Sequence, residues 1–328
     1  MGHGIQVGVV GSALVAPRDT TGACLEEALH QVTHAALRDA GIAIEDIDGI
    51  VVAGNDQLDG RAITVMMASG SVGGVSRDIL ATPSSAEHAF VLGTLRVRSG
   101  MYNTQLVVSW SPLETEDITE VQRLSADPYY HRALPLDELS AHALQAVALE
   151  SQLPDLRETA VSLTHANRLH GSRAYPEFAP APREAALIRN TPMVRYPLTQ
   201  GMVSKPAFAV VAMVLASHDW IQAHPGRSTA WVHGMGWATE TAWLGDRDLA
   251  TLPSLHAAAQ QAYKEAGISS PANAFDIAEV ADATAYQQLL ALEGLGLCPR
   301  EDWVQAVAAG EFGDQGRLPV NLDRKSVV

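Results

Sequence analysis

The stretch ALRDAGIAIEDIDGIVVA (36–53) decides the fold, because the chain contains a second stretch built in the same order. That stretch is AYKEAGISSPANAFDIAEVAD (262–282). Each has a helical pattern ending in Ala-Gly-Ile, then a short polar loop, then an acidic residue that leads into an apolar strand. Units of this kind are common in α/β proteins, so either chance or the ancient duplication of a half-domain accounts for the likeness.

Apolar runs of strand length recur along the chain and alternate with helical patterns. The strand-like runs are 5–11, 49–54, 105–110, 208–216, 229–236 and 276–281, and the clearest helical patterns are 24–41, 138–151 and 155–170. Alternation of this kind predicts an α/β fold with buried, mostly parallel strands. The longest apolar run, Ala207–Ala216, is about half of what a bilayer requires, so it predicts a buried strand and no membrane span.

Composition excludes several classes of protein. The 328 residues are 47% hydrophobic and 18% charged, with a net charge of −15. No cluster of Lys and Arg is dense enough to follow a phosphate backbone, so nucleic acid is not an expected partner. Cys24 and Cys298 cannot form a disulfide framework or a zinc site alone, and no metal-ligand spacing is apparent. The N-terminus lacks a basic leader segment, and the expected location is the cytoplasm.

The region 115–200 differs in composition, being rich in His, Arg, Tyr and Pro. It is interpreted as a loop domain inserted into the first half, of the kind that covers a ligand or forms a subunit contact. The predicted domains are therefore 1–227, with the insertion at about 115–200, and 228–328.

Several motifs together resemble the thiolase superfamily, in its sterol-carrier-protein-x and lipid-transfer branch. They are VGVVGSALVAPRDTTG, AFVLGTLRVRSGMYNTQLVVSWSPLE, HANRLHGSRAYPEF, SKPAFAVVAMVLAS, DIAEVADATAYQQLLALEGLGLC and GRLPVN. The resemblance covers nearly the whole chain. It implies two βαβαβαββ halves in five α-β-α-β-α layers, a coenzyme A thioester as substrate with no bound cofactor, a role in lipid metabolism, and dimers.

The resemblance fails at the catalytic nucleophile. The family's cysteine position falls on Pro83, and a shift of one residue gives Ser84 or Ser85; no cysteine lies near. Either serine is a candidate nucleophile if a base adjoins it, and His88 is close in sequence. The alternative is that the serine caps a helix, a role that suits this residue.

The resemblance to the family also fails at Ala281. The family reads Glu-x-His-Asp here, and this chain reads Glu279-Val280-Ala281-Asp282. A methyl group can neither donate a hydrogen bond to a thioester oxygen nor accept a proton. Thiolysis through an acyl-enzyme is therefore not expected.

The third family motif, a glycine-rich loop followed by Gly-His-Pro, is missing after Asn321. The last residues, DRKSVV (323–328), read like the translation of a sequencing adapter. The expectation is that the natural protein is longer and that the second half is incomplete here.

The remaining candidates each have two interpretations. Asp282 is a catalytic base or a helix cap, and Tyr286 presents its phenol to the pocket or packs in the core. His88 is a site residue or a partly buried histidine without a catalytic role. The segment THANRLH (164–170) lies where the family's loop domain approaches coenzyme A, and Arg168, Arg173 and Asn321 are candidates for binding it.

Two functions follow. The first is a retro-aldol or related carbon–carbon cleavage of a CoA ester, which needs a base and an enolate stabiliser but no acyl-enzyme. The second is a non-catalytic thiolase-like subunit that scaffolds or binds ligand. The expected partners are a second copy, an active paralogue, or a small zinc-ribbon/OB-fold subunit, in keeping with the same resemblance.

Overall fold

The computed structural model describes residues 5–16, 24–60, 62–83, 85–111, 118–124, 126–134, 136–174, 184–205 and 207–322. The chain divides into two compact units. The first is made of Met1–Val121 and Ala207–His233, and the second of Gln122–Pro206 and Gly234–Val328. This grouping differs from the predicted domains, because residues 122–206 group with the C-terminal part and not with the first half.

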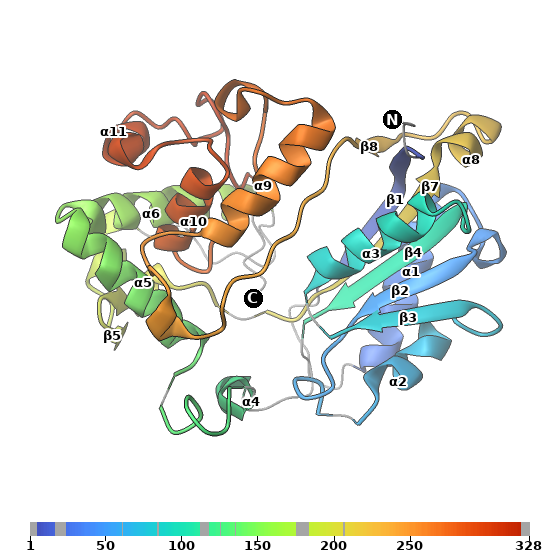
Figure 1. Ribbon diagram of the computed structural model, residues 1–328, viewed down its shortest axis with the longest axis horizontal. Coiled ribbons are helices and arrows are strands. Elements are labelled where there is room, and N and C mark those ends of the chain that lie inside the picture. The colour runs from blue at the N-terminus through green and yellow to red at the C-terminus, as the bar shows by residue number, and fades with distance from the viewer. Residues whose placement is uncertain are drawn as a thin grey trace. The chain divides into compact units, whose positions relative to one another are not determined.

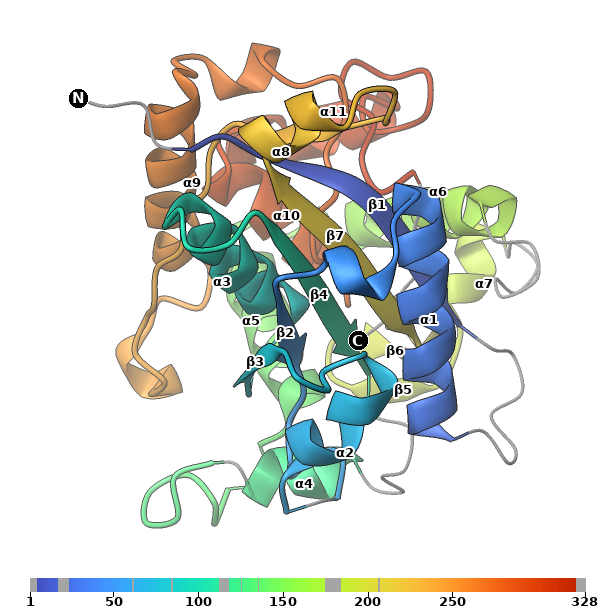
Figure 2. The ribbon, with the colours of Figure 1, turned by 90° about the vertical axis from the view of Figure 1, so that its right-hand side faces the viewer.

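The first unit is a six-stranded mixed sheet with helices on both faces (Figures 1 and 2). The strand order is β3-β2-β4-β7-β1-β8. β2 is parallel to β3 and β4, whereas β7 runs antiparallel to both β4 and β1. The elements are β1 (Val7–Val15), α1 (Leu25–Ala40), η1 (Ile44–Asp46), β2 (Gly49–Ala53), α2 (Thr64–Ser71), β3 (Asp78–Thr82), α3 (Ala86–Arg98), β4 (Thr104–Trp110), β7 (Val210–Ser217), α8 (His218–Ala223) and β8 (Ala230–Val232).

Alternation along β2 explains how both faces of this sheet are covered. Ile50 and Val52 pack in the cluster that contains the apolar side of α1, and Val51 and Ala53 pack in the cluster that contains α3. Successive side chains of a strand point to opposite faces, so a run that is apolar throughout is buried on both sides. The prediction of an α/β fold is confirmed, but the prediction of mostly parallel strands is wrong, because β7 and β8 pair antiparallel with their neighbours in this sheet.

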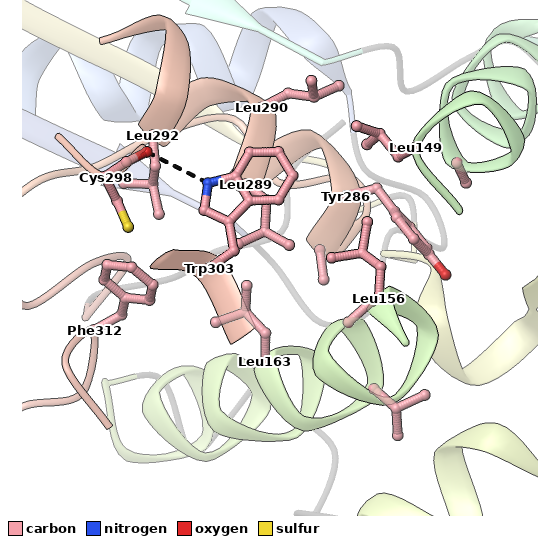
Figure 3. Packing of buried hydrophobic residues seen from close by; sticks show 14 of the residues in the cluster. Leu149, Leu156, Leu163, Tyr286, Leu289, Leu290, Leu292, Cys298, Trp303 and Phe312 are labelled. Carbon is pink, nitrogen blue, oxygen red and sulfur yellow. Dashed lines mark hydrogen bonds between the residues drawn. The ribbon is translucent and has the colours of Figure 1, made fainter. Parts of the chain in front are cut away.

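The second unit is mainly helical. Its elements are α5 (Glu138–Gln152), α6 (Leu156–Ala174), α7 (Ala185–Arg189), β5 (Met193–Arg195), β6 (Leu198–Thr199), η2 (Gln200–Met202), η3 (Leu244–Asp246), α9 (Pro253–Ala266), η4 (Pro271–Asn273), α10 (Ala285–Gly294), η5 (Arg300–Asp302) and α11 (Trp303–Ala308); α4 (Ile118–Leu124) spans the boundary. Its core joins side chains of α5, α6, α10 and α11 (Figure 3). This shared core is why residues 122–206 belong with the C-terminal part.

The two similar stretches keep their likeness up to the strand. α1 ends at Gly41 with φ +65°, and α9 ends at Gly267 with φ +72°. A short 3₁₀ turn follows in each case, η1 or η4. The first copy then forms β2 between two neighbours, whereas 276–281 makes a single bridge between Ala278 and Val320. The prediction of a strand at 276–281 is therefore wrong: among the described residues this segment forms an isolated bridge and no strand.

Gly234 and Gly236 allow the chain to pass close to α9. A Cβ on Gly236 would lie 1.9 Å from the Ala258 carbonyl oxygen, and one on Gly234 would lie 2.2 Å from that of Ala262. Both obstacles are backbone atoms, so the strand-like segment would have to move away from the helix. The two glycines are thus required by packing.

Replacing Gly236 with alanine is expected to lower the free energy of unfolding by about 1–3 kcal/mol, the usual cost of overpacking. Gly245→Ala is the matched control, because a Cβ there meets nothing within 4 Å. Urea denaturation followed by circular dichroism measures both. Equal midpoints for the two variants would contradict the packing argument.

Candidate functional site

The first unit holds a pocket at the carboxyl ends of its parallel strands. Its volume is about 360 Å³, and it is lined by Val52, Gly54, Asn55, Asp56, Gln57, Val65, Ala81, Thr82, Pro83 and Trp110. β2 ends at Ala53, β3 at Thr82 and β4 at Trp110. Open α/β sheets bind ligands at this edge. The predicted nucleophile position, Pro83, therefore lies in the wall of a pocket, but a pyrrolidine ring offers no nucleophile.

The polar groups of this pocket are held by hydrogen bonds within the protein. Asn55 donates from Nδ2 to the Pro83 carbonyl oxygen at 3.3 Å, and its Oδ1 accepts from the Gln57 amide at 3.0 Å. Asp56 Oδ1 accepts from the amide of Thr64, the first residue of α2, at 2.8 Å. These contacts fix the loop after β2 against the end of β3.

Ser85 and His88 lie together at the start of α3. Ser85 occupies the N-cap position but its side chain makes no capping hydrogen bond. Its Oγ lies 3.4 Å from His88 Nδ1, and both residues are exposed. The alternative in which the Ser85 hydroxyl caps the helix is not what the structure shows. Ser84 lies outside the described residues.

Asp282 lies in the second unit, where it is half-buried and contacts α6. Asn167 Nδ2 donates to Asp282 Oδ2 at 3.0 Å and to Gln288 Oε1 at 2.5 Å. Asn167 is 2% exposed and Gln288 is fully buried. The N-cap of α10 is Thr284, whose hydroxyl accepts from the Gln287 amide. A bridging amide that donates to a carboxylate oxygen fixes the orientation of that carboxylate.

The phenol of Tyr286 contacts Glu150. Its hydroxyl donates to Glu150 Oε1 at 2.5 Å, and the side chain is fully buried. Arg157 binds both oxygens of the same carboxylate, at 3.0 and 2.7 Å. Burial and the hydrogen bond to Glu150 raise the pKa of Tyr286. The phenol therefore stays protonated near neutral pH, and in this structure it forms part of the buried core.

The three residues predicted to bind coenzyme A occupy different surroundings. Arg173 forms an exposed ion pair with Asp314 at 3.0 Å, and Arg168 is half-buried on the same helix. Asn321 is 2% exposed, and its Oδ1 accepts from the Val280 amide at 2.8 Å. Asn321 thus holds the segment before Asp282 in place, and the coenzyme A role of all three residues stays a prediction.

His170 is nearly buried, one turn after Asn167 on α6. Burial lowers the pKa of His170, with the charge of Arg173 acting in the same direction and that of Asp314 opposing it. The unfolded chain therefore takes up this proton at a higher pH than the folded chain does. Protonation below the ordinary value of about 6.5 favours unfolding.

Stability of the second unit is thus expected to fall as pH drops from about 7 toward the lowered pKa of His170. His170→Gln removes this contribution and is expected to flatten that part of the profile. Denaturant midpoints at several pH values between 7.5 and 5 provide the measurement. Identical slopes for wild type and His170→Gln would refute it.

The candidate residues therefore form two groups, each within one unit. Ser85 and His88 lie next to Pro83 in the first, and Asp282 lies with Asn167 and Gln288 in the second. Among the described residues, no three His, Cys, Asp or Glu side chains could hold a metal ion together. The contact between Asn167 and Asp282 joins positions 115 residues apart, so no local sequence signal indicates it.

Comparison with known proteins bears on the fold of the chain. Residues 230–323 match the family model described as thiolase C-terminal domain-like. The solved structure titled Ltp2-ChsH2(DUF35) aldolase matches with a TM-score of 0.80 at 18% identity, over 97% of this chain and 84% of that one.

Two further solved structures have the same fold. A monomeric SCP2-thiolase like protein type 1 from Mycobacterium smegmatis matches with a TM-score of 0.67 at 15% identity, over 89% of this chain and 63% of that one. An acetyl-CoA acetyltransferase from Syntrophomonas wolfei matches with a TM-score of 0.68 at 16% identity, over 89% and 83%. The predicted thiolase-like fold is thereby confirmed. None of the helices in the described part of the chain has the length and apolar character that a bilayer crossing needs.

Proposed function

We propose that this chain, whose fold is thiolase-like and whose residues 230–323 match the thiolase C-terminal domain-like model, cleaves a carbon–carbon bond of a coenzyme A thioester by a retro-aldol reaction. One observation carries the proposal. The positions of the superfamily's nucleophile and imidazole hold Pro83 and Ala281, while Asp282 is present and oriented by Asn167.

The reaction needs no acyl-enzyme. In a β-hydroxyacyl thioester, the Asp282 carboxylate accepts the proton of the β-hydroxyl group. The bond between the α and β carbons breaks, a carbonyl compound leaves, and the electron pair remains as the thioester enolate. Protonation of that enolate at the α carbon gives the shortened acyl thioester, so no oxidant or co-reactant is consumed.

The similarity to a structure titled as an aldolase supports this reaction class. The name of that aldolase contains two components, Ltp2 and ChsH2(DUF35). By analogy, we include in the proposal a small zinc-ribbon/OB-fold subunit that acts with this chain. Arg168, Arg173 and Asn321 remain the proposed contacts to coenzyme A, and a cytoplasmic role in lipid metabolism remains part of the proposal.

The test is turnover of a β-hydroxyacyl-CoA by the full chain, alone and with a co-expressed zinc-ribbon/OB-fold subunit. The expected result is release of a carbonyl compound and a shorter acyl-CoA, without thiolysis of acetoacetyl-CoA. Absence of carbonyl release under both conditions would rule out the retro-aldol proposal. Cleavage of acetoacetyl-CoA by added thiol would instead support thiolysis as the reaction of this chain.

A second candidate is a non-catalytic subunit. It is favoured by Ala281, whose exposed methyl group offers no donor, and by Tyr286, whose phenol is held in the core by Glu150. A thermal shift on adding CoA esters separates the two readings when turnover is absent. Stabilisation without turnover supports a ligand-binding subunit, and no stabilisation leaves only a scaffold.

The proposed assembly is a pair of copies joined through β3. β3 is an edge strand of the first unit, and Leu80 at its centre is 43% exposed. Antiparallel pairing about Leu80 would place Asp78 opposite Thr82, so no like charges meet. Arg96 contacts Asp78 at 2.6 Å and offsets its charge. Open strand edges with exposed apolar side chains favour pairing with another chain.

Leu80→Lys is expected to convert the pair into single chains, because two lysines would face each other across the symmetry axis. Light scattering after gel filtration measures the mass in solution. Met101→Lys is the control, since Met101 is 79% exposed and lies outside β3. A wild-type chain that elutes as a single copy at all concentrations would exclude this assembly.

A further inference from the structure

Two histidines lie next to each other on the outer face of α1. His30 and His34 are both exposed, and their ring centroids are 4.2 Å apart at an interplanar angle of 63°. Residues four apart share one face of a helix. The folded helix therefore presents two imidazole rings in contact.

The backbone that carries this pair is held firmly. The opposite face of α1 buries Leu25, Leu29, Val32 and Leu37 against the sheet, and the left-handed Gly41 ends the helix. Figure 2 shows α1 lying along the sheet of the first unit. Because packing already fixes the helix, a ligand that bridges the two rings has only side-chain rotations to restrict.

The surroundings of the pair favour a cation. Within the described part of the chain, neither ring forms a hydrogen bond or an ion pair, and their contact is with each other. Glu27 is exposed and lies one turn before His30 on the same helix. The chain carries a net charge of −15. Glu27 and the net negative charge favour a positive ion, Arg38 one turn after His34 opposes it, and imidazole nitrogens are ligands for transition metals.

We propose that His30 and His34 together bind one divalent transition-metal ion of the Ni²⁺, Cu²⁺ or Zn²⁺ class. Each histidine supplies one ring nitrogen, and the other coordination positions are left to water or an external donor, since the described residues offer no third ligand nearby. Imidazole suits these ions, whereas Mg²⁺ and Ca²⁺ prefer oxygen ligands. The two histidines stand four residues apart within α1, a spacing that places both rings on one face of the helix.

The test is calorimetric titration of NiCl₂ into the full chain, produced without an affinity tag and stripped with a chelator. Wild type is expected to bind one ion at this site, and His30→Gln and His34→Gln are each expected to weaken binding by at least about tenfold. Loss of an outer-shell partner alone costs about 10–100-fold in metal affinity, so loss of a ligand should cost no less. The double variant, which keeps neither imidazole, should bind Ni²⁺ no more tightly than either single variant.

The matched control removes two other histidines of the same unit. In His218→Gln/His224→Gln the number of histidines falls equally, but His224 Nδ1 already contacts the Trp220 carbonyl oxygen at 2.8 Å and His218 lies beside Asp219. This control is expected to bind Ni²⁺ like wild type. If His30→Gln/His34→Gln binds within twofold of wild type, or the control loses as much affinity, the site is refuted. Circular dichroism checks that the exposed substitutions leave the fold intact. Heat from MgCl₂ equal to that from NiCl₂ would also overturn the proposal.

Discussion

Replacing Trp303 with alanine is expected to lower the free energy of unfolding of the second unit by about 3–5 kcal/mol. The side chain is fully buried on α11, and its Nε1 donates to the Cys298 carbonyl oxygen at 3.4 Å (Figure 3). Leu163, Leu289 and Phe312 belong to the same core. The truncation leaves a large cavity among them and an unsatisfied carbonyl, and stability of a domain totals only about 5–15 kcal/mol.

The measurement is denaturation by guanidinium chloride followed by far-ultraviolet circular dichroism. Val304→Ala is the control, because Val304 is the next residue on α11 and is 45% exposed. Its effect should remain within about 0.5 kcal/mol. A loss below about 1 kcal/mol for Trp303→Ala would show that this core is not what holds the second unit together.

Much of the first unit is predictable from sequence because its signals are local. The run at 49–54 is apolar on both faces, and it forms β2, which is buried throughout. The helical pattern at 24–41 ends at Gly41, and α1 ends there in a left-handed residue. Strand length, helical period and a glycine cap depend on neighbouring residues alone, so they can be recognised without knowledge of the fold.

The second unit is harder to predict because its determinants are distant in sequence. The segment 276–281 has the composition of a strand, yet whether a strand forms depends on its partners. Among the residues that the structure describes, Val320 alone forms a bridge with it. The grouping of 122–206 with the C-terminal part depends on α5 and α6 packing against α10, which the composition does not reveal.

Some features of the candidate site can likewise be recognised from local sequence, and others depend on residues that are distant in the sequence. Pro83 and Ala281 are visible as missing functional groups because the motifs around them remain. By contrast, two hydrogen bonds join residues that lie more than a hundred positions apart in the sequence. Asn167 donates to Asp282 and orients it, and the Tyr286 hydroxyl donates to Glu150. Sequence could therefore propose Asp282 and Tyr286 as alternatives, and the structure gives a reason to test Asp282 first.

Asp282→Asn is expected to lower kcat for carbonyl release from a β-hydroxyacyl-CoA by about 10²–10⁴-fold, the usual contribution of a general base. The amide is nearly isosteric but cannot accept the hydroxyl proton. Asn167→Ala is expected to have a smaller effect in the same direction, because the carboxylate remains but loses the donor at 3.0 Å that orients it. In the Asp282→Asn background, Asn167→Ala should cause little further loss.

Two controls separate the base from general damage to this region. Asp276→Asn removes an exposed carboxylate of the same segment and should leave kcat unchanged. Tyr286→Phe removes the hydroxyl that donates to Glu150. It is expected to lower the unfolding midpoint and to leave kcat nearly unchanged, since the phenol stabilises the core. Full activity in Asp282→Asn would place the base elsewhere. A large fall in kcat for Tyr286→Phe with unchanged stability would instead identify the phenol as the group that moves the proton.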